Sequence, residues 1–247
     1  MKLKILQWNI WYKEDPRKIA DEIIRIDPDI VCAQELMQNL KKDLDTPKII
    51  SEKIKYYYFY KEAVTWDSRF DITSQGNAIF SKFPIFDTKF EFLSDFEHNP
   101  ANATKEGRVY VESKIRLGAR LLGVGTTHLS YSFRFKNTPR RKKEADKLAE
   151  IIKNKKNKFI LTGDLNNSPK SYVVNKILEN KNLKNAGPDD SEMTWTTKPF
   201  DYHGFKEDNL KWRIDYVFVS NEINVLSSRI ISTKVSDHLP ILTEVEV

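Results

Sequence analysis

Five short segments of the sequence each end an apolar run with a side chain that could bind a cation or carry a proton. The segment TGDLNNSP ends the apolar strand expected at 158–161 and places Asp164 and Asn166 two positions apart, so both should point the same way. Carboxylate and amide oxygens are the hard ligands that suit Mg²⁺. The other four segments provide an amide, two carboxylates and two imidazoles: Asn9, Glu35, His128, Asp237 and His238.

Each of these residues also has an ordinary structural explanation. Asp164 and Asn166 belong to the residue types that dominate turns and helix caps. Glu35 could be a surface carboxylate after a buried strand, and a single histidine is more often structural. In all five segments, however, a polar side chain stands where an apolar run stops. This shared arrangement indicates a common site.

The composition is that of a globular domain. The chain has 247 residues, 40% of them hydrophobic, which is enough to bury a substantial core. No low-complexity segment, linker or repeat divides the sequence, so residues 1–247 are expected to form a single domain. Cys32 is the only cysteine, which excludes an intramolecular disulfide and a cysteine-based metal site.

The apolar runs are short. The first residues, MKLKILQWNIW, carry too short an apolar run for a secretory signal. Nothing approaches the roughly 20 consecutive apolar residues that a membrane span needs. These features predict a soluble, cytoplasmic protein, and we expect a monomer.

The charge points to an anionic partner. The formal net charge is +6, and the densest basic segment, 134–143, follows and interleaves with Tyr131, Phe133 and Phe135. Aromatic and cationic side chains together suit stacking on bases and pairing with phosphates, which makes Arg134 and Arg140 candidate nucleic-acid contacts. The alternative is that the basic run is only the solvated first turn of a helix.

The chain alternates predicted strands with predicted helices, which indicates an α/β or α+β fold. Helices should begin at Pro16, Pro139 and Pro169, each behind a capping residue, and Gly118 should lie in a hairpin turn. The strands are predicted at 3–10, 30–34, 56–65, 77–81, 109–117, 120–127, 158–161, 214–219, 228–233 and 239–245.

With a sixth string, WRIDYVFVS around Asp215, these segments resemble, in the same order, the motifs of the endonuclease/exonuclease/phosphatase superfamily of metal-dependent phosphoesterases. The resemblance runs from about residue 3 to the C-terminus. It implies a four-layer α/β/β/α sandwich, in which two packed sheets are flanked by helices and the site lies at one rim. Periodicity alone does not give this architecture.

The resemblance also implies roles for the residues. Glu35 would be the principal ligand of Mg²⁺, for which Mn²⁺ could substitute, with Asn9 and Asp237 on the metal side. Asp164 would orient and activate water, and Asn166 would donate to a phosphoryl oxygen. Asp215 would support His238. The remaining candidates would stabilise the phosphate or contact the substrate: His128, Asn77 and Arg108.

Two strings help to choose among branches of the superfamily. THLS at His128 looks like the DNase I, phosphatase and tyrosyl-DNA phosphodiesterase branches, and it makes an AP endonuclease a poorer match. TWTTKP resembles the tyrosyl-DNA phosphodiesterase string, but Thr196 replaces an aspartate, and GDLNNSP differs too. The inositol phosphatase signature is missing.

Three functions therefore stay open. The first is a Mg²⁺-dependent phosphodiesterase that acts on DNA or RNA, such as a nuclease or an end-processing enzyme. The second is a phosphoesterase for phospholipid head groups or soluble phosphate metabolites. The third is a non-catalytic interaction module, which the full set of polar residues disfavours.

Overall fold

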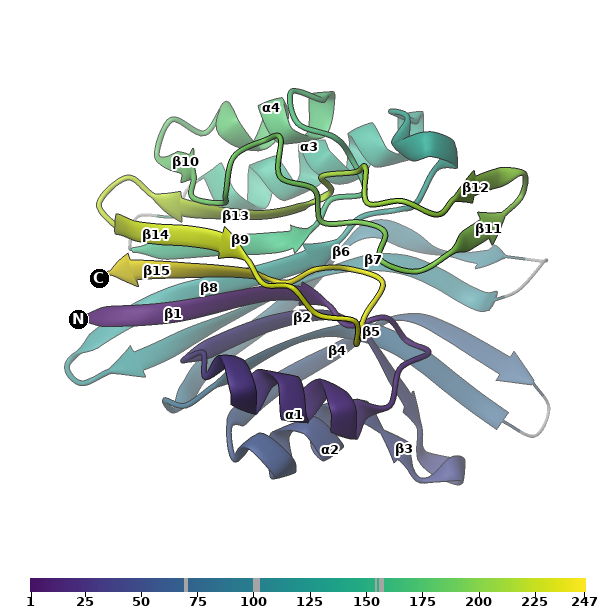
Figure 1. The fold of residues 1–247 in the computed structure, drawn as a ribbon, viewed down its shortest axis with the longest axis horizontal. Coiled ribbons are helices and arrows are strands. Elements are labelled where there is room, and N and C mark those ends of the chain that lie inside the picture. Colours follow the sequence, from purple (N-terminus) through teal and green to yellow (C-terminus); the bar gives the residue numbers. More distant parts are fainter. Residues whose placement is uncertain (69–70, 100–102, 154, 156–157) are drawn as a thin grey trace.

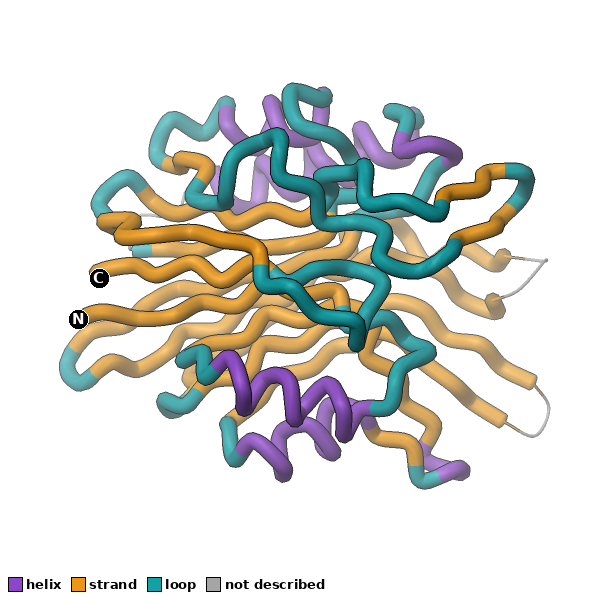
Figure 2. The backbone as a smooth tube through the Cα atoms, in the orientation of Figure 1, coloured by secondary structure: helices purple, strands orange, loops and turns teal. Residues whose placement is uncertain are grey.

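The computed structural model describes residues 1–68, 71–99, 103–153, 155 and 158–247. Their backbone forms two β-sheets packed face to face, with helices on both outer faces (Figure 1). The tube view shows the strands running side by side through the middle of the molecule, between the two groups of helices (Figure 2). This arrangement confirms the four-layer α/β/β/α sandwich implied by the sequence motifs.

The described residues contain four α-helices and two short 3₁₀ turns. The helices are α1 (Pro16–Ile26), α2 (Thr46–Ile54), α3 (Pro139–Lys153) and α4 (Tyr172–Leu178), and the 3₁₀ turns span Leu40–Lys42 and Phe133–Phe135. None of the helices in this part of the chain has the length and apolar character needed to cross a membrane.

The strands follow most of the predicted ranges and add several that sequence reasoning missed. They are β1 (Lys2–Asn9), β2 (Ile30–Asn39), β3 (Leu44–Asp45), β4 (Tyr57–Ser68), β5 (Asp71–Ser81), β6 (Ile85–Asn99), β7 (Ala103–Leu117), β8 (Arg120–His128), β9 (Phe159–Asp164), β10 (Leu183–Asn185), β11 (Phe200–Tyr202), β12 (Phe205–Glu207), β13 (Asp215–Ser220), β14 (Asn224–Ile230) and β15 (Ile241–Glu246).

The order of the strands brings the site residues to one rim. The hydrogen-bonded strand order is β10-β13-β9-β8-β7-β4-β5-β2-β1-β15-β14, with β6 on β7 and β3 on β2, and β11 pairs with β12 in a separate two-stranded sheet. The two packed halves of the long order are joined where β4 pairs with β7, at Val64 with Glu106 and Thr65 with Lys105. Most pairs are antiparallel, but β1 and β2 are parallel, as are β8 and β9. Because parallel neighbours end at the same edge, His128 lies opposite Asp164 in register, and Asp215 begins β13 on the other side of Asp164.

Alternating side chains build three apolar layers. On β9, Ile160 packs into the cluster between the two sheets, while Leu161 packs outward against α3 and α4. On β1, Ile5 faces the other sheet, and Trp8 joins the cluster under α1 and α2. Every residue of β9 is buried, so the strand that carries Asp164 is held from both faces.

Two of the three predicted helix starts are confirmed, and the third is wrong. Asp15 caps α1 by accepting a hydrogen bond from the backbone N–H of Arg17, and α3 begins at Pro139. The third helix, α4, begins at Tyr172 rather than at Pro169, and the cap is Ser171. The backbone at Lys170, with φ of 62°, is left-handed, which is incompatible with a helix that has already begun.

Candidate active site

The loops at the rim where β1, β8 and β9 end surround a cleft of about 610 Å³. Its polar lining includes seven of the residues that the sequence singled out: Glu35, Arg108, His128, Asp164, Asn166, Asp237 and His238. Asn9 and Asp215 do not line the cleft, but each is hydrogen-bonded to at least one of the seven. One site thus collects side chains from the two ends of the chain and its middle.

Asp164 lies at the centre of this group. Its Oδ2 accepts a hydrogen bond from Nδ2 of Asn9 at 3.0 Å, and its Oδ1 accepts one from the backbone N–H of Asn166 at 2.8 Å. Burial, together with the charge of Asp215, raises the pKa of the Asp164 carboxyl to about 7. A carboxyl with a pKa near neutrality can take and release a proton under physiological conditions.

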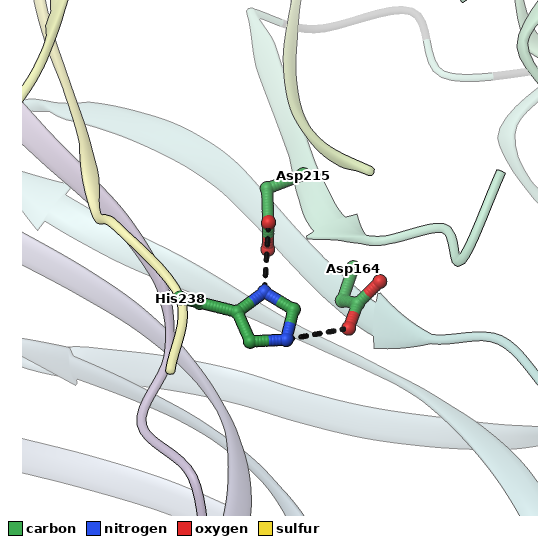
Figure 3. Close-up of side chains that lie close together, drawn as sticks. All are labelled: Asp164, Asp215 and His238. Carbon is green, nitrogen blue, oxygen red and sulfur yellow. Dashed lines mark hydrogen bonds and ion pairs between the residues drawn. The ribbon is translucent and has the colours of Figure 1, made fainter. Parts of the chain in front are cut away.

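His238 is held between two carboxylates (Figure 3). Its Nδ1 lies 2.9 Å from Oδ2 of Asp215, and its Nε2 lies 3.7 Å from Oδ2 of Asp164. Burial opposes protonation of the ring, but the charges of Asp215 and Asp237 outweigh it and raise the pKa of His238 to about 10. The side chain is therefore an imidazolium at neutral pH.

Asp164, Asp215 and His238 offer ligand atoms that all lie within 4.8 Å of one another, close enough to hold one metal ion. A ring that carries protons on both nitrogens has no lone pair for a metal, however. While His238 is protonated, this group can present a positive charge and a proton to an anionic substrate.

His128 stands in contrast to His238. Burial, together with the positive charges of Arg108 and His238, lowers its pKa well below the usual value. The neutral ring can accept at Nε2, which lies 3.0 Å from Nδ2 of Asn166. That amide also donates to the carbonyl oxygen of Leu129 at 2.9 Å. Both N–H groups of Asn166 are thus used inside the protein, so a bond to a phosphoryl oxygen would have to replace one of them.

The sequence suggested that the strand stops at Glu35, but the structure shows that it does not. β2 continues to Asn39, and the pairing register shifts between Ala33 and Leu36, where Glu35 takes a left-handed backbone conformation with φ of 65°. This bulge turns the side chain toward the cleft. Its carboxylate accepts hydrogen bonds from Nδ2 of Asn9 at 3.0 Å and from the backbone N–H of Tyr12 at 3.2 Å.

Asn9 therefore links two carboxylates. Its Nδ2 donates to both Glu35 and Asp164, and its Oδ1 accepts from the backbone N–H of Trp11 at 3.1 Å. With its oxygen turned to Trp11, the amide acts here as a spacer that fixes the distance between the two carboxylates.

Glu35 and Asp237 form the part of the cleft that suits a divalent cation. Burial and the charge of Asp237 raise the pKa of Glu35, so the two carboxylates repel each other. In the part of the chain that the structure describes, neither forms an ion pair with a lysine or an arginine. Oδ2 of Asp237 accepts from the neutral Nε1 of Trp195, at 3.1 Å. The His238 imidazolium offsets part of this negative charge, and a divalent cation would neutralise the rest.

Three other candidates lie outside the cleft lining. Asn77 is buried on β5 and donates to the carbonyl oxygen of Val109, which ties β5 to β7. Arg140 pairs with the buried carboxylate of Glu144 through Nε at 3.2 Å, and the exposed Arg134 stacks over Phe133. The structure thus does not bring these three side chains together with Asp164.

The basic segment also holds a residue that sequence reasoning missed. Arg141 is completely buried, and its guanidinium donates to the carbonyl oxygens of Ser130, at 2.8 Å, and Asn166, at 2.6 Å. It also donates to the hydroxyl of Ser132 at 2.7 Å. Arg141 therefore holds the loop after β8 against the loop after β9. Nothing in the sequence RRKK distinguishes the one cation that points inward.

Part of the cleft lining is aromatic, and sequence reasoning missed it as well, apart from Tyr131. Tyr131 comes from the loop after β8, and Phe200 and Tyr202 come from β11. We call these three residues the aromatic wall. Their aromatic character is visible in the sequence, but only the fold shows that residues 131 and 202 face the same space.

The comparisons with known proteins agree with this geometry. Residues 6–238 match the family model described as the endonuclease/exonuclease/phosphatase family. No curated protein matches the sequence significantly.

Solved structures share the fold at low sequence identity. The human Nocturnin catalytic domain is 20% identical with a TM-score of 0.73, and the match covers 99% of this chain and 94% of that one. D. rerio TDP2, solved with a single-strand DNA product, is 18% identical with a TM-score of 0.70 and coverage of 100% and 99%. A mannosyl-6-phosphatase from Bacteroides thetaiotaomicron is 18% identical with a TM-score of 0.69 and coverage of 99% and 100%. Because the family model spans nearly the whole sequence, this chain belongs to the endonuclease/exonuclease/phosphatase family, whose members are hydrolases of phosphoester bonds.

Proposed function

We propose that the protein is a Mg²⁺-dependent phosphodiesterase that acts on nucleic acid, as a nuclease or as an enzyme that processes strand ends. The observation that carries this proposal is the placement of Asp164, a carboxyl with a pKa of about 7, between the Asn9 amide and the His238 imidazolium in one cleft. A proton acceptor next to a proton donor is what hydrolysis of a phosphodiester needs.

Glu35 and Asp237 would hold the metal. When bound, Mg²⁺ would neutralise charge on the phosphoryl group. Asp164 would take the proton of the attacking water through Oδ2. His238 would donate its Nε2 proton in a hydrogen bond to a phosphoryl oxygen, while Asp215 keeps the ring oriented through Nδ1. Arg108, which lines the same cleft, would add a second positive charge near the phosphate.

Two observations favour a nucleic-acid substrate. The net charge of +6 attracts polyanions. Among the similar structures, TDP2 is solved with a single-strand DNA product. A second candidate is a soluble phosphate metabolite, because the cleft has the size of a small-molecule site and one similar structure is a mannosyl-6-phosphatase. A phospholipid head group would belong to the same alternative.

A single cleavage experiment tests the proposal. The substrate is a 3′-labelled single-stranded oligonucleotide with a 5′-phosphotyrosyl group, incubated with Mg²⁺ or with EDTA. We expect products only with Mg²⁺, and none from Asp164→Ala. Asp190→Ala, the same substitution at an exposed position away from the cleft, is the matched control and should cleave normally.

The products also show which bond is attacked, because internal cuts and loss of tyrosine give different lengths. No product with either Mg²⁺ or Mn²⁺ would overturn the nucleic-acid proposal and favour the soluble metabolite. Activity that falls steeply with salt would support a polynucleotide, because binding of a polyanion releases counterions.

A further inference from the structure

We propose that the aromatic wall, formed by Tyr131, Phe200 and Tyr202, is a subsite that stacks one nucleobase beside the reacting phosphate. This inference rests on the proposed function and narrows its substrate to a nucleotide that presents a single unpaired base.

The three rings form one surface. Tyr131 lies 6.0 Å from Phe200 and 5.8 Å from Tyr202, and Phe200 lies 6.3 Å from Tyr202, measured between ring centroids. The interplanar angles of 59°, 76° and 47° show that the rings are not stacked flat on one another. Tyr202 is 43% exposed, so its ring is open to contact with a ligand.

A buried aromatic cluster packs against this surface and fixes it. Trp195 and Phe205 are 4% and 2% exposed, and their ring centroids lie 5.0 Å and 5.6 Å from that of Phe200. Phe135 packs against Trp195 at 5.1 Å. Because these rings form a packed core, the wall is preorganised and a ligand would lose little affinity in ordering it.

The same cluster places the wall next to the reacting groups. The ring of Trp195 lies 6.3 Å from that of His238, and its Nε1 donates to Asp237. The Trp195 ring therefore contacts both Phe200 and the His238 imidazolium that would face the phosphate. A base joined to that phosphate through one sugar is of the right size to reach the wall.

The polar groups around the wall suit a base better than an acyl chain. Gln75 lines the same cleft and offers an amide donor and acceptor, whereas Lys198 and Asp201, which also line it, pair with Glu14 and Lys206. A base has a polar edge and two apolar faces, and so uses both kinds of side chain.

The cleft fits one or two nucleotides rather than a duplex. Its volume of about 610 Å³ lies within the range of small-ligand pockets. Two cations of the basic segment are not available to extend it, because Arg141 is buried against backbone carbonyls and Arg140 pairs with Glu144. A base at a strand end or in a free nucleotide is the ligand that this shape admits.

The test compares a ligand that has a base with one that lacks it. Thymidine 5′-monophosphate and 2-deoxyribose 5-phosphate are titrated by calorimetry, with Mg²⁺, into the Asp164→Asn protein, which should not turn either over. We expect the nucleotide to bind at least about tenfold more tightly, as the loss of one base–aromatic stack predicts. Adding Tyr202→Ala should lower the ratio of the two affinities by about tenfold. Tyr202→Phe, which keeps the ring, should leave this ratio unchanged.

Tyr57→Ala, the same change at an exposed tyrosine on β4 away from the cleft, is the matched control. Equal affinity for the two ligands, or a preference that survives both Tyr202→Ala and Phe200→Leu, would overturn the subsite. The proposed function fails separately, if the protein with Asp164 intact cleaves no oligonucleotide. A base preference that persists in that case would still support the subsite.

Discussion

Nδ1 of His238 lies 2.9 Å from Oδ2 of Asp215, and both side chains are buried. Burial by itself would keep the imidazole neutral. The neighbouring carboxylates reverse this and raise the pKa of His238 to about 10, with Asp215 contributing most. The positive charge in the cleft is therefore a property of the pair and depends on the carboxylate as much as on the ring.

Asp215→Asn should lower the pKa of His238, because burial would remain while the strongest opposing charge is removed. The chain has four histidines, so an NMR titration can resolve each ring. We expect turnover near neutral pH to fall by about 10²–10⁴-fold. Asp190→Asn serves as the control, and an unchanged His238 titration in Asp215→Asn would contradict the role given to the Asp215 charge.

The metal-free protein should lose stability as the pH rises. The pKa of His238 is about 10 in the folded state, compared with 6.5 for an ordinary histidine. Its contribution to the free energy of unfolding is therefore fully present below about pH 6.5 and is lost as the pH approaches about 10. Urea unfolding in EDTA at several pH values measures the free energy of unfolding. In His238→Gln, the decrease of this free energy between about pH 6.5 and about pH 10 should be smaller. If the free energy of unfolding depended on pH in the same way in both proteins, His238 would not be the source of the pH dependence.

Asp164→Asn should separate activity from stability. Removal of the proton acceptor is expected to lower kcat by about 10²–10⁴-fold. Because burial and Asp215 raise the pKa of Asp164 to about 7, the ionised carboxylate costs stability above that pH. The metal-free variant should therefore unfold at the same or a higher urea concentration than the wild type at about pH 8. A fully active variant would remove Asp164 from the mechanism.

Glu35→Gln should weaken metal binding. We expect the affinity for Mg²⁺ and for Mn²⁺, measured by calorimetry, to fall by about tenfold or more, because one of two repelling carboxylates loses its charge. Mg²⁺ should also raise the melting temperature of the wild type more than that of the variant. Glu222→Gln, at an exposed position, is the control. Equal affinities would place the metal elsewhere.

Arg141→Met should destabilise the fold. The change leaves the carbonyl oxygens of Ser130 and Asn166 without their donor inside the protein, and we expect a loss of about 1–3 kcal/mol in the free energy of unfolding for each of them. Lys143→Met, on an exposed position of the same helix, should change it by less than about 0.5 kcal/mol. Urea denaturation compares the two. Similar values for both would mean that Arg141 does not hold the loops together.

The sequence predicts best the residues that local pattern and strand direction place together. Asn9, His128 and Asp164 each end a strand, and β1 and β8 have parallel neighbours, so the ends of these strands meet at one rim. The six motifs also implied the four-layer fold, which the structure confirms.

Features that depend on tertiary contacts could not be predicted. The bulge at Glu35 depends on pairing with β5, and the helix after Asp164 begins three residues late because of the left-handed backbone at Asn166 and Lys170. The inward direction of Arg141 depends on backbone carbonyls that only the folded loops present. No pattern in one segment of the sequence contains such information.

The left-handed backbone at Glu35 has a consequence for how this chain would change in evolution. A residue with a side chain is strained at φ of 65°, and glycine is not. If the carboxylate were of no use, random substitution would favour glycine at this position, because the fold would gain stability from it. If Glu35 holds the metal as proposed, a lineage that had lost hydrolysis should therefore drift toward glycine at position 35.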